Sequence, residues 1–242
     1  MCGRYSLAPA EFSQIQLEFR VQASLELVPR YNFELVPRYN IAPTWAPGFE
    51  PPIVFAGESG RRELALGRWW MIPSGWARPL QALPTAFNAR AEELVQKPFW
   101  SRSFETRRCL VPATGWREFT GPSGCRRPFQ FHYDHGLFAF AGVWDLWSSH
   151  EGDAVRSFAI VTVAANDMVA PVHDRMPLRV EPAEYAAWLD PTLSGAAALS
   201  VVRGASARPL SRYEADPIGN DGRLEGPECI APARTRQLGL FD

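Results

Sequence analysis

Apolar positions along the chain recur with a period of two more often than with the period of a helix. Residues 156–164 form a nearly continuous apolar run, and residues 129–144 alternate apolar and polar side chains around Asp134-His135-Gly136. These patterns are typical of β-strands, and the turn residues predict a hairpin over 129–144. Shorter apolar runs predict further strands at 53–56, 64–71 and 108–112.

Fewer segments have a helical period. In residues 9–22, Phe12, Ile15 and Phe19 are spaced as on one helix face, and Pro9 suits a first turn. The other helices are predicted at 92–106 with a break near Pro98, at 182–189 and at 195–202. Strands outnumber helices and come in runs, which predicts an α+β fold whose mostly antiparallel, curled, barrel-like sheet has a few flanking helices.

The composition indicates one folded unit. Of the 242 residues, 46% are hydrophobic and 21% are charged, which suffices for a sizeable core and argues against disorder. No linker-like stretch divides the chain, so we predict a single domain over 1–242. Its motifs span about 2–231, the chain from Arg203 onward is rich in loops, and 232–242 is predicted to be a tail.

Residues 26–41 contain a tandem repeat, ELVPRYNF followed by ELVPRYNI. A period of eight residues is too short for a solenoid unit. The repeat is either a local duplication, with one copy forming extra loop, or an artefact of the sequence. Only the second copy continues into Ile41-Ala42-Pro43.

The charge and cysteine content limit the classes of function. The formal net charge of −1 does not favour a nucleic-acid-binding protein, although a local cationic cleft is compatible with it. None of the four cysteines has CxxC spacing, so no metal is expected. The sequence shows no signal-peptide pattern and no apolar run of about 18 residues, which predicts a cytoplasmic protein with reduced thiols and no membrane contact.

Cys2 is the first candidate for chemistry. A small side chain at position 2 favours removal of Met1, which would leave an amine and a thiol on adjacent carbons. Their reference pKa values of about 7.7–8.0 and about 8.5 give both groups a reactive fraction near neutral pH. Such an aminothiol condenses with an aldehyde to an imine and then closes to a thiazolidine, without metal or cofactor. On position alone, an ordinary frayed terminal residue is the simpler interpretation.

Seven short segments change that interpretation. They are CGRY at 2–5, RYNIAPT at 38–44, WMIPSGW at 70–76, NARAE at 88–92, RCLVP at 108–112, GWREF at 115–119 and HDRMP at 173–177. In this order they resemble the SRAP family (SOS response-associated peptidase type) from residue 2 to about residue 231. The chain departs from the family pattern at Trp70, where glycine is usual, at an inserted Gly75, and at Phe119, where tryptophan is frequent.

The resemblance implies a reactive quartet. Cys2 is the nucleophile, Asn88 positions the amine or the sugar oxygens, Glu118 is the acid/base, and His173 is a second proton-transfer group. Imine formation needs proton removal from the amine and proton delivery to a departing hydroxyl, which these residue types can provide. Taken singly, Glu118 could be a solvated carboxylate, His173 a buried imidazole or an ion-pair partner of Asp174, and Asn88 a helix cap.

The resemblance also implies the partner, single-stranded DNA that contains an abasic site. The protein is expected to be a monomer that joins the nucleoid on binding DNA and meets replication-fork proteins there. No base-reading pattern is visible, so binding should follow the backbone and the lesion. The predicted phosphate-binding residues are Arg4, Arg90, Lys97 and Arg175, the predicted stacking residues are Pro43, Trp76 and Phe119, and Thr162 completes the DNA-binding set.

The sequence hypothesis is therefore a covalent thiazolidine link between Cys2 and an abasic site, which shields the lesion, with self-removal of Met1 and slow lyase-type reversal. Two alternatives remain open. The same residue types could serve a thiol peptidase, which does not need its cysteine at the chain start. The chain could also be a non-catalytic DNA-binding module, which would hold intact DNA in a salt-dependent way.

Overall fold

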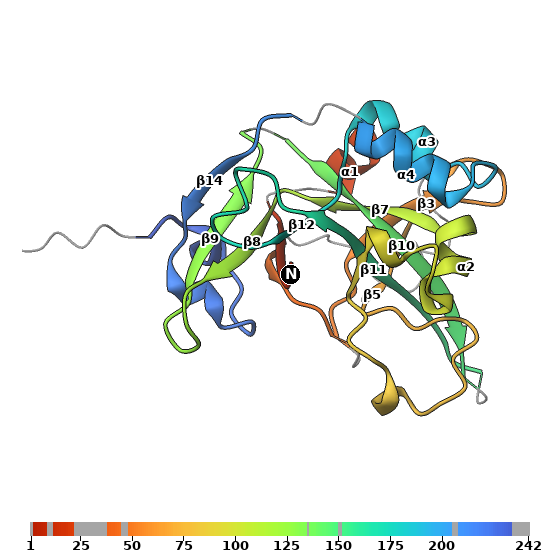
Figure 1. Ribbon diagram of the computed structural model, residues 1–242, viewed down its shortest axis with the longest axis horizontal. Helices are drawn as coiled ribbons and strands as arrows, with labels where there is room; N and C mark the ends of the chain where they lie inside the picture. The colour runs from red at the N-terminus through yellow and green to blue at the C-terminus, as the bar shows by residue number, and fades with distance from the viewer. Residues whose placement is uncertain are drawn as a thin grey trace, which may run out of the picture.

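A computed structural model describes residues 2–8, 12–21, 38–44, 48–134, 136–149, 152–204 and 208–233. Within these residues the chain forms two β-sheets that meet over a common core, with short helices around them (Figure 1). No helix in this part of the chain is long and apolar enough to cross a membrane.

The smaller sheet is antiparallel throughout. Among the described residues its strands, in spatial order, are β14 (Ser211–Glu214), β9 (Arg127–His132), β8 (Gly115–Thr120), β1 (Arg4–Leu7) and β2 (Arg38–Ile41). The register places Arg4 opposite Arg117 and Tyr5 opposite Trp116. The turn from β8 to β9 uses Gly121, whose φ of 96° is a conformation that side chains other than glycine adopt rarely.

The larger sheet is mostly antiparallel. Its main path in the described residues is β12 (Arg175–Pro177), β11 (Ala154–Ala164), β10 (Phe138–Ser148), β7 (Arg108–Ala113), β3 (Pro52–Ala56) and β4 (Arg62–Leu66). Three short strands join it from the side: β13 (Arg179–Val180) pairs with β10, while β5 (Arg68–Trp69) and β6 (Asn88–Arg90) pair with β11 in parallel. The parallel pairing brings β6 beside the end of β11 that leads toward β12.

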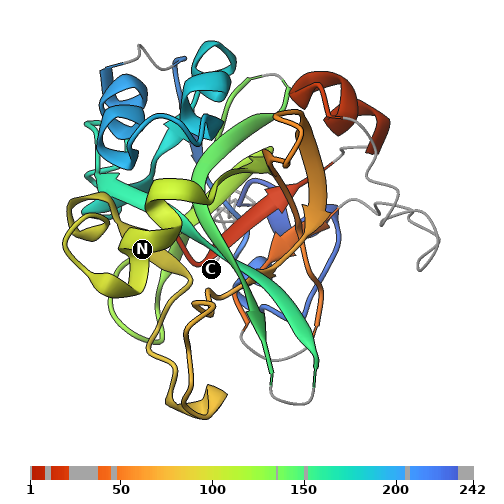
Figure 2. The ribbon, with the colours of Figure 1, turned by 90° about the vertical axis from the view of Figure 1, so that its right-hand side faces the viewer.

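The helices pack outside the larger sheet. They are α1 (Phe12–Phe19), α2 (Pro98–Thr106), α3 (Tyr185–Leu189) and α4 (Gly195–Gly204), with single 3-10 turns η1 (Leu80–Ala82), η2 (Ala91–Glu93), η3 (Pro182–Glu184), η4 (Pro217–Asn220) and η5 (Pro227–Ile230). In Figure 2 the blue α3 and α4 lie above the yellow-green α2 on one side, and the red α1 lies on the other. The buried Arg108 guanidinium joins this helical layer, since it donates to the carbonyls of Phe104, Glu105, Trp188, Asp190 and Leu193.

Aromatic side chains connect the two sheets. Trp116 of β8 stacks on Phe131 of β9 at 5.1 Å between ring centroids and meets Phe140 of β10 edge-on at 5.9 Å. Tyr5 of β1 meets Trp69 of β5 at 5.0 Å. Burial of large apolar rings is a strong driving force for folding. The two sheets are therefore held as one body, and this fixes the start of β1 relative to the larger sheet.

The predicted fold class is confirmed: the protein is α+β, and its strands are mostly antiparallel. The strands divide between two sheets, and the described residues show no closed barrel. The strands predicted at 53–56, 64–71, 108–112 and 156–164 are present as β3, β4 with β5, β7 and β11. The predicted helices are present as α1, as η2 followed by α2 from Pro98, as η3 with α3, and as α4.

The hairpin predicted over 129–144 is wrong. Both strands exist, but β9 pairs with β8 and β14, whereas β10 pairs with β7, β11 and β13. The chain turns near Gly136, whose φ is 80°, and passes from one sheet to the other. Phe131 and Phe138 are both fully buried. The alternation of apolar residues showed that each strand has a buried face, but it could not show which strand would pair with it.

Some predicted features lie wholly or partly outside the described residues. These are positions 9–11 and 22 of the first helix, the first ELVPRYN copy, and 234–242 of the predicted tail. The end of the second copy forms β2, which lies next to β1. Within the region predicted to be loops, Ser211–Glu214 form β14 on the edge of the smaller sheet, a strand that its mostly polar sequence did not indicate.

Candidate active site

Cys2 lies two residues before the start of β1 and is completely buried. The N-terminus marked in Figure 1 is at the centre of the molecule, where β8 of one sheet approaches β11 and β12 of the other. The Cys2 Sγ points toward the Arg4 carbonyl at 3.7 Å. Burial raises the pKa of the Cys2 thiol well above its ordinary value, and the nearby Glu118 charge raises it further. The thiol is therefore protonated at neutral pH, and the terminus is not the frayed end that its position suggested.

Asn88 fixes the backbone of Cys2. Its Nδ2 donates a 2.7 Å hydrogen bond to the Cys2 carbonyl, across 86 positions of sequence. Asn88 is the first residue of β6, which is held against Ile160 of β11, so the amide is carried by a strand rather than a loop. The turn η2 that follows has Arg90 at its cap position with no side-chain cap bond, so Asn88 is not a helix cap here.

Glu118 enters the site from β8, where it pairs opposite Phe129 and is only 1% exposed. Burial is the main cause that raises the pKa of Glu118 to about 7, and the Asp174 charge raises it further. The alternative of a solvated carboxylate is therefore wrong. A carboxyl group with a pKa near the working pH can both accept and donate a proton, which is what a general acid/base requires.

His173 lies in the loop before β12. Its Nδ1 accepts a 3.0 Å hydrogen bond from the Arg175 amide and also lies 2.8 Å from Oδ1 of Asp174. The two contacts require different states of Nδ1, because Nδ1 must carry a hydrogen to donate to Asp174 and must lack one to accept from the Arg175 amide. Burial lowers the pKa of His173, and this effect outweighs the Asp174 charge. We therefore assign a neutral ring with its proton on Nε2.

The four predicted reactive residues thus come together from both sheets. Asn88 bonds to Cys2, the Glu118 charge acts on the Cys2 thiol, and Asp174 links Glu118 electrostatically to His173. The arrangement offers a buried thiol, an amide that holds the Cys2 backbone, a carboxyl group with a pKa of about 7 and a neutral imidazole. No cluster of possible metal ligands occurs among the described residues, and their four cysteines form no disulfide.

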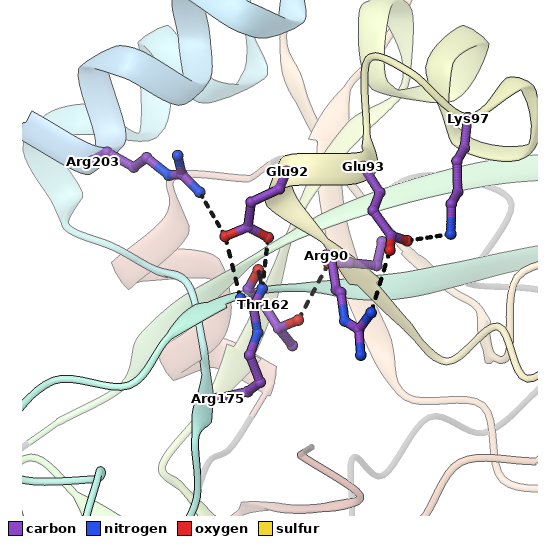
Figure 3. Close-up of polar contacts among 8 residues, drawn as sticks. Arg90, Glu92, Glu93, Lys97, Thr162, Arg175 and Arg203 are labelled. Carbon is purple, nitrogen blue, oxygen red and sulfur yellow. Dashed lines mark hydrogen bonds and ion pairs between the residues drawn. The ribbon is translucent and has the colours of Figure 1, made fainter.

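Two charged groups lie beside β6 on η2 (Figure 3). In the first, Glu93 accepts from Arg90 at 3.3 Å and from Lys97 at 2.7 Å, and both cations are more than half exposed. Of the predicted phosphate-binding residues, these two have the most accessible charges. The spacing of Glu93 and Lys97, four residues apart, is a pairing that sequence alone could have indicated.

In the second group, Glu92 is shared by two arginines. Arg175 donates to both Glu92 oxygens at 3.2 and 2.8 Å, and Arg203 of α4 approaches Oε1 at 3.4 Å. Arg175 also donates to the Thr162 carbonyl at 2.7 Å. Thr162 itself is completely buried, and its hydroxyl lies 3.5 Å from the Ala89 carbonyl, so its side chain faces β6 rather than solvent. Sequence reasoning missed Glu92 as a link and Arg203 altogether, because α4 is distant in the chain.

The other predicted DNA-binding residues are not brought to the quartet in the same way. Arg4 begins β1 and its charge acts on the Cys2 thiol, but its guanidinium donates to the Gly3 carbonyl and lies against Gly222. Phe119 follows Glu118 in β8, so it points to the opposite face. Trp76 packs against Phe99 of α2 at 6.3 Å, and Pro43 is half-buried just after β2.

Comparisons with known proteins place the chain among relatives of similar length. The family model for SOS response associated peptidase (SRAP) matches residues 1–219. The chain is 28% identical over 236 residues to the abasic site processing protein YoqW of Bacillus subtilis (strain 168), and the match covers 95% of this chain and 99% of YoqW. It is 26% identical over 171 residues to the abasic site processing protein YedK of Escherichia coli (strain K12), covering 68% and 72% of the two chains.

Solved structures share the fold. A protein from Bacteroides thetaiotaomicron superposes with a TM-score of 0.79 at 22% identity, covering 96% of this chain and all of the other. A phage-related protein from Bordetella bronchiseptica superposes with a TM-score of 0.63 at 29% identity, covering 88% and 93%. Since the family model spans most of the sequence, the chain belongs to the SOS response associated peptidase (SRAP) family.

Proposed function

We propose that the protein captures abasic sites in single-stranded DNA through a thiazolidine formed at Cys2, and so shields the lesion. The observation that carries the proposal is the buried Cys2 held by Asn88 next to a carboxyl group of raised pKa. The relatives named above, described as abasic site processing proteins, support the same substrate. Met1 must first be removed, and we assign that cleavage to the same site.

The chemistry requires one water to leave. The Cys2 amine adds to C1′ of the ring-opened sugar, and the carbinolamine loses its hydroxyl as water to give an imine. The thiol sulfur then adds to the imine carbon, while its proton is transferred to the nitrogen. The product is a five-membered ring that contains both the sulfur and the nitrogen. The groups that react, namely the free amine, the aldehyde and the thiol, are uncharged, as is the ring that forms, and this suits a buried site.

The protonation states favour this route over thiol proteolysis. A cysteine protease needs a thiolate, whose pKa is lowered by neighbouring positive charge. Here burial and Glu118 raise the pKa of the Cys2 thiol. The thiol need not ionise to take part, because it adds to an imine that the amine has already formed. Its proton can go to the new ring nitrogen.

Asn88 is placed to orient the amine. Its Nδ2 is used by the Cys2 carbonyl, while its Oδ1 is buried and has no hydrogen-bond donor among the described residues. Buried acceptors are rarely left unsatisfied. The amine that Met1 removal creates is a donor on the same residue that Asn88 already holds, and it would satisfy this oxygen.

Glu118 and His173 divide the proton transfers. Glu118, with a pKa near 7, takes the amine proton and returns one to the departing hydroxyl. The neutral His173 ring donates from Nε2 to the sugar oxygens, which promotes ring opening. When the same groups transfer protons in the reverse direction, they release the link slowly in a lyase-type step.

The strand itself is proposed to lie along η2. Arg90 and Lys97 offer exposed charges for backbone phosphates, and Arg175 adds positive charge at the rim of the quartet. Two further roles remain predictions from the sequence. These are stacking by Pro43, Trp76 and Phe119, and DNA contacts by Arg4 and Thr162. Binding of this kind follows the backbone and the lesion rather than base identity.

The decisive experiment mixes purified protein with a single-stranded abasic oligonucleotide and examines it by denaturing gel and intact mass. The expected product is the sum of both masses less one water, stable without reductant, because a bare imine would hydrolyse. Cys2→Ala should give no stable adduct. Glu118→Gln should slow its formation by about 10²–10⁴-fold, the usual contribution of a general acid/base.

A glycine inserted before Cys2 separates the proposal from both alternatives. The insertion keeps the thiol but moves the free amine to another residue, so thiazolidine formation should be abolished. A thiol peptidase could keep its activity in this variant. A non-catalytic DNA-binding module would form no denaturation-resistant adduct even in the wild type. Cross-linking by the extended protein at the wild-type rate would refute the mechanism.

A further inference from the structure

We propose that Arg203 of α4 binds a backbone phosphate of the strand that carries the abasic site, and that Glu92 holds it in place beside Arg175. The inference rests on the proposed function and extends its DNA surface from η2 onto α4. Arg203 is 111 positions from Glu92 in the sequence, so only the tertiary structure brings the two together.

The first support is how differently the two arginines use their donors. Arg175 is 15% exposed, and its guanidinium makes both Glu92 contacts and the bond to the Thr162 carbonyl. Arg203 is 43% exposed and, among the described residues, has a single contact, from Nη2 to Glu92 at 3.4 Å. Arg175 is thus built into the fold, whereas Arg203 keeps most of its donors for an external acceptor.

The second support is the charge that remains after pairing. Glu92 carries one negative charge against Arg175 and Arg203, and Glu93 carries one against Arg90 and Lys97. Each group of three therefore keeps a net charge of +1. The two carboxylates are adjacent residues of η2, so the two positively charged groups lie next to each other, one on each side of this turn (Figure 3). Two neighbouring cationic groups can bind separate phosphates of one single strand.

The third support is the surface next to Arg203. A hollow of about 470 Å³ lies here, lined in part by Glu92, Val163, Met176, Leu178, Val202 and Arg203. This volume is within the range of about 300–1,000 Å³ that is usual for small-ligand pockets, so the hollow has room for part of a nucleotide. The charged residues of its lining are one acid, Glu92, and two arginines, Arg179 and Arg203, so a strand that places a phosphate on Arg203 can continue over this hollow without meeting a surplus of negative charge.

The role of Glu92 follows from its position between the arginines. Its oxygens orient Arg175 and reach Arg203 at the same time, so Glu92 acts on the DNA only through them. A long arginine side chain loses rotamer freedom when it binds phosphate. A carboxylate that already restricts Arg203 reduces that loss, which makes Glu92 a positioning residue.

The test measures the rate of adduct formation at low protein concentration with two abasic DNAs: a 15-mer and a trinucleotide with one nucleotide on each side of the lesion. Arg203→Gln should slow capture of the 15-mer by about 3–10-fold and leave the trinucleotide unchanged. The slope of log rate against log salt for the 15-mer should fall in magnitude by about 0.7, the value for one phosphate contact on a single strand. Arg126→Gln, an exposed arginine in the β8–β9 turn, removes the same charge and should change neither rate.

Glu92→Gln tests the positioning role through a double-mutant cycle. At 300 mM salt, where the added net charge is largely screened, Glu92→Gln should slow capture of the 15-mer, and adding Arg203→Gln should slow it little further. Any of three results would overturn the inference. These are equal effects of Arg203→Gln and Arg126→Gln on the capture rate, an equal effect of Arg203→Gln on both DNAs, and additive effects of Glu92→Gln and Arg203→Gln in the cycle. A wild-type protein that captures neither DNA overturns the proposed function instead, and the inference with it.

Discussion

At the scale of single residues, burial determines the chemistry of the site. Cys2 and Glu118 are both almost inaccessible to solvent, and in each case burial is the main cause that raises the pKa. A neutral thiol and a half-protonated carboxyl group follow from the same physical effect, since a low-dielectric surrounding disfavours both anions. His173 is shifted in the opposite direction because its charged form is the cation.

The shift at Glu118 predicts a pH dependence of stability. Its pKa is about 7 in the folded protein and 4.5 as the ordinary value, so the folded protein retains a proton that the unfolded chain releases between these pH values. Stability contributed by this group is therefore complete below pH 4.5 and is lost as pH rises through 7, by at most about 3 kcal/mol.

Urea unfolding of Glu118→Gln at pH 5 and pH 8 checks this. The glutamine is neutral at both values, so the variant should gain about 2–3 kcal/mol relative to the wild type between pH 5 and pH 8. The control is Glu58→Gln, which removes a carboxylate at an exposed position and should show no such gain. If the difference in the free energy of unfolding between the wild type and Glu118→Gln is the same at pH 5 and pH 8, burial does not raise the pKa of Glu118.

At the scale of elements, close contacts between helices and strands hold the site-bearing parts in register. Gly195 begins α4 directly against Phe104 of α2, and a Cβ at that position would lie 2.6 Å from the ring and 2.8 Å from the carbonyl oxygen. The absence of a side chain thus sets how closely α4, which carries Arg203, approaches α2.

Gly195→Ala should therefore destabilise the protein by about 1–3 kcal/mol, the usual cost of overpacking a close contact. Thermal unfolding measures the change. Gly75→Ala is the matched control, because a Cβ there meets nothing within 4 Å and the substitution should stay within about 0.5 kcal/mol of the wild type. If the two variants melt at the same temperature, Gly195 of α4 does not pack closely against Phe104 of α2.

Arg108 links a strand to the helical layer through hydrogen bonds alone. It is 3% exposed, and its guanidinium serves five backbone carbonyls of α2, α3 and the segment before α4. Arg108→Met keeps much of the volume but leaves these buried acceptors without their donor. We expect a loss of at least about 3 kcal/mol in the free energy of unfolding, since each unsatisfied buried acceptor costs about 1–3 kcal/mol.

The measurement for Arg108→Met is denaturant unfolding, with Arg102→Met as the control. Arg102 lies on the exposed side of α2, and its substitution should change stability by no more than about 0.5 kcal/mol. A stable Arg108→Met variant would mean that water molecules or other N–H groups donate to these carbonyl oxygens in place of the guanidinium.

At the scale of the whole molecule, the distribution of charge matters more than its sum. The formal net charge is −1, which gives DNA no general attraction. Glu92 and Glu93 of η2 nevertheless each pair with two cations, which leaves positive charge beside the quartet. Attraction of DNA is therefore expected to be local and to involve few phosphates.

This distribution predicts a shallow salt dependence. With three to four phosphate contacts, the slope of log capture rate against log salt should be about −2 to −3 for a single strand. A slope near zero would indicate that the cations do not contact phosphates, and a slope far steeper than about −4 would indicate a much larger basic surface than η2 and α4 provide. Rates with an abasic 15-mer between 50 and 300 mM salt give this value.

The sequence by itself determined the α+β class, the positions of the α-helices and of about half of the strands among the described residues, and the four residues that we propose to be reactive. Helices and buried strands are local patterns of apolar positions, so they can be identified without knowing their neighbours. The quartet was identified because its short segments resemble a family in a fixed order, and the structure then brought Asn88 to Cys2 and the Glu118 charge onto the Cys2 thiol.

Only the tertiary structure decided which strands pair and which charges meet. The pattern over 129–144 fixed two buried faces, yet β9 and β10 joined different sheets because long-range partners cover those faces. Arg203, distant in sequence, reached Glu92 through the packing of α4 on α2 and α3. The pKa values of Cys2 and Glu118 likewise depend on burial, which is produced by contacts between distant segments and cannot be obtained from the residues that carry it.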